Sequence, residues 1–161
     1  MMDLNGYLKK TGVSKKKYVD RWIDKDLIPG AKRDADKKSY QFLESSLRPY
    51  QNSGLKPGAK ADNLRAHIVK AALLRQYISH SMCYMSKGEF NQMVSEMVDA
   101  GLLQLRTEDG VVYIDSTLKS NAYLDKSVAE IRKFVLDCLA TVTKAAAEGV
   151  TKACLDKVLT L

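Results

Sequence analysis

A short break at residues 11–13 separates two helical patterns near the start of this chain, and it constrains the fold more than any other feature. Leu4, Tyr7 and Leu8 repeat at the spacing of one helix face. Asp3 is placed to cap this helix, and Gly12 to end it in a left-handed conformation. Because the break is so short, the next helix must cross the first one steeply, which predicts a helix-turn-helix.

The second helix is expected to begin at Ser14, which is placed to cap it. Its apolar face is formed by residues at helical spacing, namely Tyr18, Val19, Trp22 and Ile23. Its polar side carries the cations Lys15, Lys16, Lys17, Arg21 and Lys25. Cations at a helix N-terminus oppose the macrodipole, and a bound phosphate resolves this conflict because it accepts from the free amides and attracts the lysines. A lysine run that is merely solvated is the alternative interpretation.

A charged loop follows this helix and leads into a short strand. Residues 27–30 end the helix, and residues 39–42 alternate like a half-buried strand. The loop between them supplies four cations, Lys32, Arg33, Lys37 and Lys38. We therefore expect a basic hairpin, or wing, that holds backbone phosphates beside the groove that the second helix enters.

The net charge of +7 lies entirely in the first part of the chain. Residues 1–60 hold 14 Lys or Arg against 7 Asp or Glu, whereas residues 61–161 hold 12 of each kind. A small unit with such an excess attracts polyanions and releases their condensed counterions, so nucleic acid is the expected partner. Solubility alone is the other explanation of the same excess.

Residues 2–45 resemble the winged helix-turn-helix of the MerR and excisionase-like superfamily. The resemblance rests on the Gly12-Val13-Ser14 turn, on Trp22 late in the second helix, on the Leu27-Ile28-Pro29 exit and on Tyr40 in the hairpin strand. It implies a recognition helix that begins at Ser14 and lies in the major groove, with a wing on the flanking phosphates. Beyond residue 60 the chain has neither the long coiled coil nor the cysteine pattern of metal- or drug-sensing members, so a sensing role is not expected.

A stretch rich in Pro, Gly and polar residues predicts a linker at residues 51–60, followed by a second unit. Its first helix is expected over residues 62–79. The next begins at Ser86, which forms a capping box with Glu89, and ends at Gly101. Apolar runs on either side of residues 107–110, which end in Asp-Gly, then predict a hairpin.

This order of helix, helix and hairpin is again that of a winged helix, and it suggests a degenerate duplication of the first unit. The second of these helices is acidic, since it carries Glu89, Glu96 and Asp99. Protein contact or scaffolding is therefore expected of the second unit rather than DNA binding.

A helical segment over residues 125–161 ends the chain, with its natural break at Gly149. One stripe follows the spacing of a helix face: Val128, Ile131, Val135, Cys138 and Val142. The stripe either packs on the second unit or forms the seam of a homodimer, because helix-turn-helix proteins commonly bind paired half-sites.

The sequence predicts neither an enzyme nor a cofactor or metal site. His67 and His80 stand thirteen residues apart, which does not suit two ligands of one metal, and none of the common catalytic or nucleotide-binding motifs is present. The three cysteines are too few and too widely spaced for a disulfide framework. With no membrane-length apolar run and no signal-like start, we expect a cytoplasmic protein that does not contact membranes.

The sequence thus predicts a mainly α-helical protein with short β-hairpins and three parts. Residues 1–50 form a winged helix-turn-helix, residues 51–60 a linker, and residues 61–161 a winged-helix-like unit with C-terminal helices for interaction or dimerisation. The expected function is sequence-specific binding of double-stranded DNA by a bacterial, phage or mobile-element transcriptional regulator. The alternatives are a protein-interaction module that acts through residues 61–161, and an excisionase-like architectural factor.

The residues expected to contact DNA fall into two groups. Those expected at the major groove are Ser14, Lys15, Lys16, Lys17, Tyr18 and Arg21, and Lys25 on the same side of the helix is also expected to contact DNA. Those expected on flanking phosphates are Lys32, Arg33, Lys37 and Lys38. Tyr18 is ambiguous, since its spacing also suits a place in the core.

Overall fold

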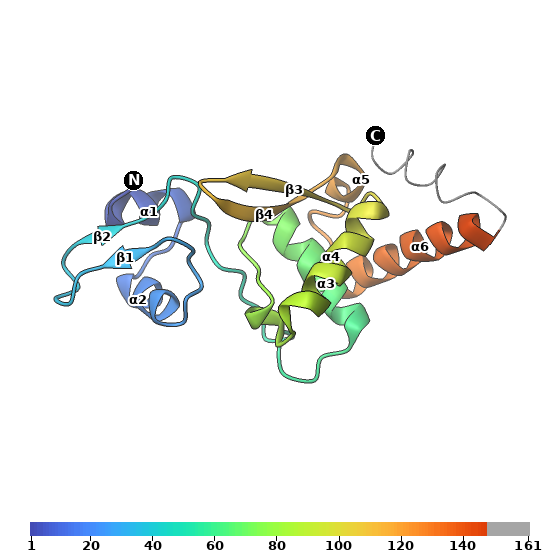
Figure 1. Cartoon of the computed structure of the whole chain (residues 1–161), viewed down its shortest axis with the longest axis horizontal. Coiled ribbons are helices and arrows are strands. Elements are labelled where there is room, and N and C mark those ends of the chain that lie inside the picture. The colour runs from blue at the N-terminus through green and yellow to red at the C-terminus, as the bar shows by residue number, and fades with distance from the viewer. Residues whose placement is uncertain (148–161) are drawn as a thin grey trace.

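The structure is a computed structural model, and it describes residues 1–147 of the chain. This part is mainly α-helical and contains two antiparallel sheets of two strands each (Figure 1). The predicted class, mainly helical with short hairpins, is confirmed. Within the same range no helix combines the length and the apolar character that a membrane span needs.

The first unit contains two helices and one small hairpin, and it occupies one end of the molecule (Figure 1). Its elements are α1 (Leu4–Thr11), α2 (Lys16–Asp24), β1 (Lys32–Arg33) and β2 (Tyr40–Gln41). The strands pair antiparallel, with Lys32 opposite Gln41 and Arg33 opposite Tyr40. Helix, turn, helix and hairpin therefore follow one another in the predicted order.

The helix ends of the first unit agree with the sequence at α1 and differ at α2. Asp3 Oδ1 accepts a 2.8 Å hydrogen bond from an amide of the first turn of α1, and Gly12 ends α1 with φ of 73°. The predicted cap of α2 is wrong by one residue, because Lys15 rather than Ser14 takes the N-cap position and no side chain caps the helix. The cause lies in the turn: Val13 is buried, and the chain then stays extended through Lys15.

A small apolar core holds the first unit together. It consists of Tyr7, Val13, Val19, Trp22, Ile28, Tyr40 and Phe42. Tyr7 stacks on Phe42 with ring centroids 4.3 Å apart. The backbone of Phe42 also pairs with Met2, with N–O distances of 2.8 and 2.9 Å, so the start of the chain is tied to the residue that follows β2.

The second unit contains most of the helices and the longer hairpin (Figure 1). Its elements are α3 (Ala61–Leu73), a 3-10 helix (Ser81–Cys83), α4 (Lys87–Asp99), β3 (Leu103–Glu108), β4 (Val111–Ser116), α5 (Leu118–Asn121) and α6 (Val128–Ala147). The cap of α4 is confirmed, since Ser86 Oγ accepts from the Glu89 amide at 3.2 Å. The hairpin is confirmed as well: Asp109 and Gly110 have φ of 53° and 76°, the left-handed pair that a tight two-residue turn requires.

The first helix of the second unit is shorter than predicted. It ends at Leu73, and Arg75 adopts a left-handed φ of 56°, so the predicted extension to residue 79 is wrong. The chain leaves the helix because Tyr77 pairs with the segment before α3. Its amide donates to the Arg48 carbonyl, and its carbonyl accepts from the Tyr50 amide, both at 2.8 Å.

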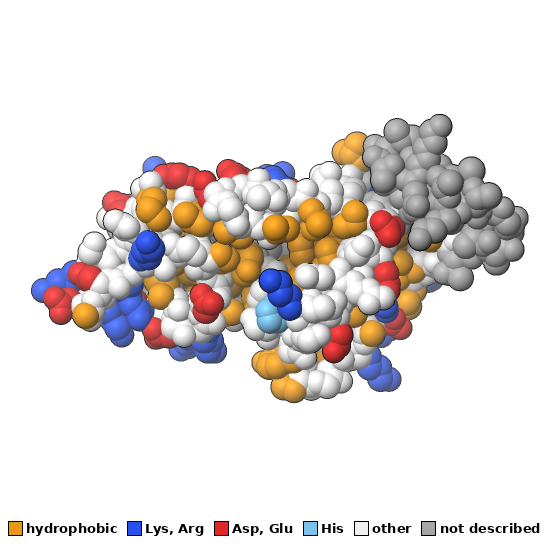
Figure 2. Space-filling model, in the orientation of Figure 1, with side chains coloured by type: hydrophobic (Ala, Val, Ile, Leu, Met, Phe, Trp, Pro, Cys, Tyr) orange, Lys and Arg blue, Asp and Glu red, His pale blue; other side chains and the backbone are white. Residues whose placement is uncertain are grey.

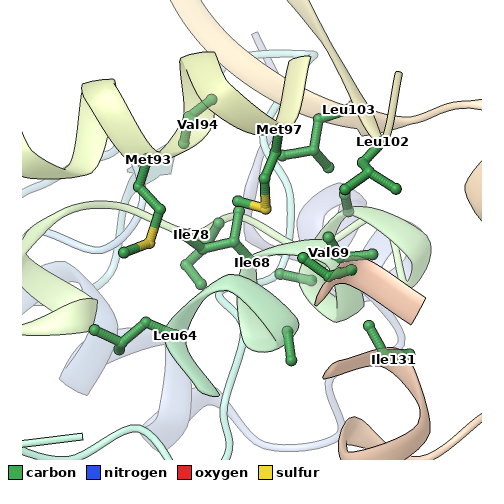
Figure 3. Close-up of a cluster of buried hydrophobic side chains, with 14 of the residues drawn as sticks. Leu64, Ile68, Val69, Ile78, Met93, Val94, Met97, Leu102, Leu103 and Ile131 are labelled. Carbon is green, nitrogen blue, oxygen red and sulfur yellow. The ribbon is translucent and has the colours of Figure 1, made fainter. Parts of the chain in front are cut away.

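The core of the second unit lies between α3, α4, the start of β3 and α6 (Figure 3). Ile68, Met97 and Ile131 are fully buried there and come from three different helices. The C-terminal stripe joins the same core, since Ile131, Val135 and Cys138 are buried among its side chains and α6 packs along α3. These side chains therefore do not form an exposed dimer seam, and dimerisation stays a prediction. Residues 148–161, with the predicted break at Gly149, lie outside the described range.

The two units are joined by direct contacts around Ser45. The Ser45 amide donates to Asp109 Oδ2 at 3.1 Å, and its hydroxyl lies 2.8 Å from the Tyr113 hydroxyl. Hairpin β3–β4 thus contacts the turn that follows the first hairpin. The start of the predicted linker is also anchored, because Tyr50 is buried and its hydroxyl lies 2.8 Å from His67 Nδ1.

Replacing Met97 by Ala tests this second core. Met97 is fully buried, and we expect the cavity to lower the free energy of unfolding by about 2–5 kcal/mol, measured by urea denaturation followed by circular dichroism. The matched control is Leu118→Ala, because Leu118 is 92% exposed and its loss should change stability by less than about 0.5 kcal/mol. Equal effects of the two substitutions would contradict the assigned core.

Candidate nucleic-acid interface

Two carboxylates on α2 are bound by the neighbouring hairpin. The guanidinium of Arg33 on β1 donates to Asp20 Oδ1 at 3.0 Å and also to Asp24 Oδ1. The Tyr40 hydroxyl donates to the same oxygen of Asp20 at 2.6 Å. Burial by itself raises the pKa of Asp20, but the hydrogen bonds from Tyr40 and Arg33 and nearby positive charge outweigh it, so this pKa lies below its ordinary value. Both carboxylates therefore face the hairpin rather than the open side of α2.

The outward side of α2 carries cations without acids. Lys17, Arg21 and Lys25 follow one another at steps of four residues, so they lie along one side of the helix and its cap. All three are exposed, and within residues 1–147 none of them forms an ion pair. We call these three residues the basic face of α2. Tyr18 lies beside them, 37% exposed, with Lys17 Nζ at 5.5 Å and Arg21 Cζ at 5.9 Å from its ring centroid, so it belongs to the surface.

Lys16 connects the start of α2 to the tip of the hairpin. Its Nζ donates to the Lys37 carbonyl at 2.7 Å and lies 5.2 Å from the centroid of the Tyr40 ring. The two residues before it, Ser14 and Lys15, are exposed. Because no side chain caps α2, the amides of its first turn lack a side-chain acceptor and can bind an anion.

The predicted cations of the hairpin differ in their surroundings. Lys32, Lys37 and Lys38 are exposed, and their ammonium groups form no ion pair in the part of the chain that the structure describes. The side chain of Arg33 is only 16% exposed and pairs with α2. Arg33 therefore positions the hairpin, and we do not include it among the residues that face a ligand.

Lys and Arg side chains gather over α2 and hairpin β1–β2, at the end of the molecule that the first unit occupies (Figure 2). In the second unit, by contrast, two arginines are held in ion pairs, Arg65 with Asp62 and Glu96, and Arg106 with Glu108 and Asp115. The excess positive charge seen in the sequence is thus displayed by the first unit.

Two reactive side chains in the described part of the second unit, His67 and Cys83, serve packing. His67 is buried, and burial lowers its pKa, which keeps the imidazole that contacts Tyr50 neutral. Cys83 is also buried, which raises its pKa to about 12 and suppresses the thiolate. Among the described residues no three His, Cys, Asp or Glu side chains come together in a way that could hold a metal ion.

A mostly apolar hollow of about 600 Å³ lies between α4 and hairpin β3–β4. Leu105 and Val112, which line it, are 54% and 56% exposed. Hydrophobic side chains are visible over this middle part of the molecule in Figure 2. If the second unit binds a protein, as the alternative interpretation of the sequence holds, this is the surface on which to look for the contact.

Sequence reasoning did not select Arg48. This residue lies between the hairpin and the second unit, outside every helical or strand pattern. The fold brings its guanidinium carbon to 5.9 Å from the centroid of the Trp22 ring, next to the basic face of α2. Its position depends on how the segment between β2 and α3, which we call the strap, packs against both units. No local signal in the sequence indicates that packing.

Comparison of the chain with protein-family models, with curated proteins and with solved structures finds no match in any of the three.

Replacing Asp20 by Asn tests the contact between α2 and the hairpin. The substitution removes the charge that binds Arg33 and Tyr40, and we expect the first unit to lose about 1–3 kcal/mol of stability. The measurement is urea denaturation followed by the fluorescence of Trp22, the one tryptophan of the chain, which is buried in this unit. The control is Asp36→Asn at the exposed tip of the same hairpin, for which we expect less than about 0.5 kcal/mol.

The stability difference between the wild type and Asp20→Asn should depend on pH. Because the pKa of Asp20 is lowered in the folded state, its stabilising effect is present above the unfolded value of about 3.9 and is lost as pH falls through the folded pKa. Below about pH 4 the stability of the wild type should therefore approach that of Asp20→Asn. A difference that persists unchanged into strong acid would contradict this role.

Proposed function

We propose that this chain binds double-stranded DNA sequence-specifically, with α2 in the major groove and hairpin β1–β2 against flanking phosphates. One observation carries the proposal. Arg33 turns Asp20 and Asp24 toward the hairpin, which leaves Lys17, Arg21 and Lys25 as an exposed row of cations without a partner acid. A helix of this kind fits the width of the major groove and meets no repulsion from its own carboxylates.

The surroundings of α2 support the same assignment. Lysine and arginine read guanine edges in the major groove, and α2 presents both from a helix whose other side is packed on a core. The exposed lysines of the hairpin, Lys32, Lys37 and Lys38, are suited to phosphate contacts that position the helix without reading sequence. At the start of α2, Ser14 and Lys15 stand beside amides without a side-chain cap, where a phosphate is favoured.

We further propose that the protein is a transcriptional regulator of a bacterium, phage or mobile element. The support is the resemblance of residues 2–45 to the MerR and excisionase-like superfamily, together with the matching order of α1, turn, α2 and hairpin. An architectural role in recombination is the second outcome to test, and it is distinguished by strong bending of the bound DNA.

Selection of duplexes from a random pool by the full chain tests the proposed function. We expect enrichment of one sequence, and fluorescence anisotropy should then show a preference over scrambled duplex of about a thousandfold or more. A homodimer on paired half-sites predicts a two-fold symmetric selected sequence. Binding that is weak, indiscriminate and abolished by moderate salt would refute the proposal.

Charge-removing substitutions separate reading of bases from contact with phosphates. We expect Lys17→Gln to weaken binding to the selected duplex by about 1–3 kcal/mol and to change the ranking of altered sequences. Lys38→Gln should instead weaken binding to all duplexes alike and reduce the slope of log affinity against log salt by about 1.

The matched control is Lys133→Gln, which removes the same charge from an exposed position on α6, far along the chain from α2. We expect it to leave both affinity and ranking unchanged. If Lys17, Lys38 and Lys133 had equal effects, the division between groove and phosphate contacts would be wrong.

A further inference from the structure

Arg48 lines a cavity at the C-terminal end of α2. The cavity measures about 290 Å³, and its lining residues are Tyr18, Arg21, Trp22, Lys25, Leu27, Arg48 and Gln51. Three of them are cations and none is an acid. Like charges gathered around one hollow repel each other, and a bound anion relieves this repulsion.

The backbone on both sides of Arg48 is anchored by hydrogen bonds, so the position of its Cα atom is fixed. The Tyr7 hydroxyl donates to the preceding carbonyl, that of Leu47, at 2.9 Å. The carbonyl of Arg48 itself accepts from the Tyr77 amide at 2.8 Å, and the next two residues, Pro49 and Tyr50, are buried. An anchored guanidinium loses less entropy when it binds, and its planar donors suit two oxygens of a phosphate.

The position of the cavity along α2 points to the backbone of the same DNA. At a rise of about 1.5 Å per residue, Lys17 and Lys25 are about 12 Å apart along the helix axis, which equals the width of the major groove. The hairpin tip lies at the start of α2, where Lys16 binds the Lys37 carbonyl, and the cavity lies at the other end. The two ends of the helix are thus placed to meet phosphates on the two sides of one groove.

We propose that Arg48, together with Lys25, forms a subsite for a backbone phosphate of duplex DNA at the C-terminal end of α2. The subsite rests on the proposed function and extends it. It adds a contact from the strap between the two units, which makes the second unit necessary for full affinity because that unit anchors the strap through Tyr77 and Tyr50.

The first test is Arg48→Gln in the full chain, titrated with the selected duplex and with scrambled duplex over a range of salt. We expect affinity for both duplexes to fall about three- to tenfold, with unchanged sequence ranking and a salt slope smaller by about 1. Arg48→Lys keeps the charge and should restore the slope. Lys133→Gln again serves as the control of equal charge change, and Trp22 fluorescence in urea shows whether each variant is folded.

The second test locates the phosphate. Single phosphates of the selected duplex are replaced in turn by uncharged methylphosphonates. We expect one position at which the replacement weakens binding of the wild type but not of Arg48→Gln, since the partner is then already missing. If every methylphosphonate lowers the affinity of the wild type and of Arg48→Gln by the same factor, the subsite does not exist.

The outcomes distinguish this proposal from the one on which it rests. Wild-type affinity and slope in Arg48→Gln, alongside a loss in Lys17→Gln, would overturn the subsite and leave the proposed function standing. If no sequence were selected, and neither Lys17→Gln nor Arg48→Gln changed binding to DNA, both proposals would be overturned. Saturable quenching of Trp22 by inorganic phosphate, dependent on Arg48 and without any effect of Arg48→Gln on DNA, would assign the cavity to free phosphate and also overturn the subsite.

Discussion

The contact of Arg33 with Asp20 and Asp24 supports the whole arrangement of the first unit. A hairpin with only two paired residues on each strand is too small to be stable by itself. Arg33 and the Tyr40 hydroxyl hold it against α2, while the Tyr40 ring joins the core. The same contact determines the electrostatics, because it pairs both acids of α2 with the hairpin and leaves Lys17, Arg21 and Lys25 facing solvent. Stability and the proposed recognition of DNA therefore depend on one set of charges.

The second unit explains how a small first unit can present this surface in a defined orientation. Its hairpin contacts Ser45 through Asp109 in the turn and through Tyr113 on β4, which ties the two units together. His67 on helix α3 contacts the hydroxyl of Tyr50, and this contact anchors the strap that carries Arg48. The second unit has a balanced charge and a core of its own, so its contacts fix the end of the strap nearest to it.

Much of the fold could be predicted because its signals are local. The Asp3 cap, the Gly12 terminus, the Ser86 cap and the Asp109-Gly110 turn each depend on residues a few positions apart, and the structure confirms all four. Two features could not be predicted in this way. α3 ends early because Tyr77 pairs with the segment before α3, and of the two alternatives for the C-terminal stripe the structure shows packing on the second unit. Both depend on contacts between segments far apart in the chain, whereas the shift of the α2 cap from Ser14 to Lys15 arises locally, in the turn at Val13.

The sequence by itself determined where the helices and turns lie, which unit carries the net charge of +7, and which lysines are candidates for contact with a polyanion. Only the tertiary structure decided which charges are available. From the sequence, Arg33 is one of four cations expected to face DNA, but in the fold it forms ion pairs with α2. Arg48 belongs to no sequence pattern, yet the fold places it over the ring of Trp22. The physical reason is that helix and turn formation depend on neighbouring residues, whereas the pairing of a charge depends on what the folded chain brings within a few ångströms of it.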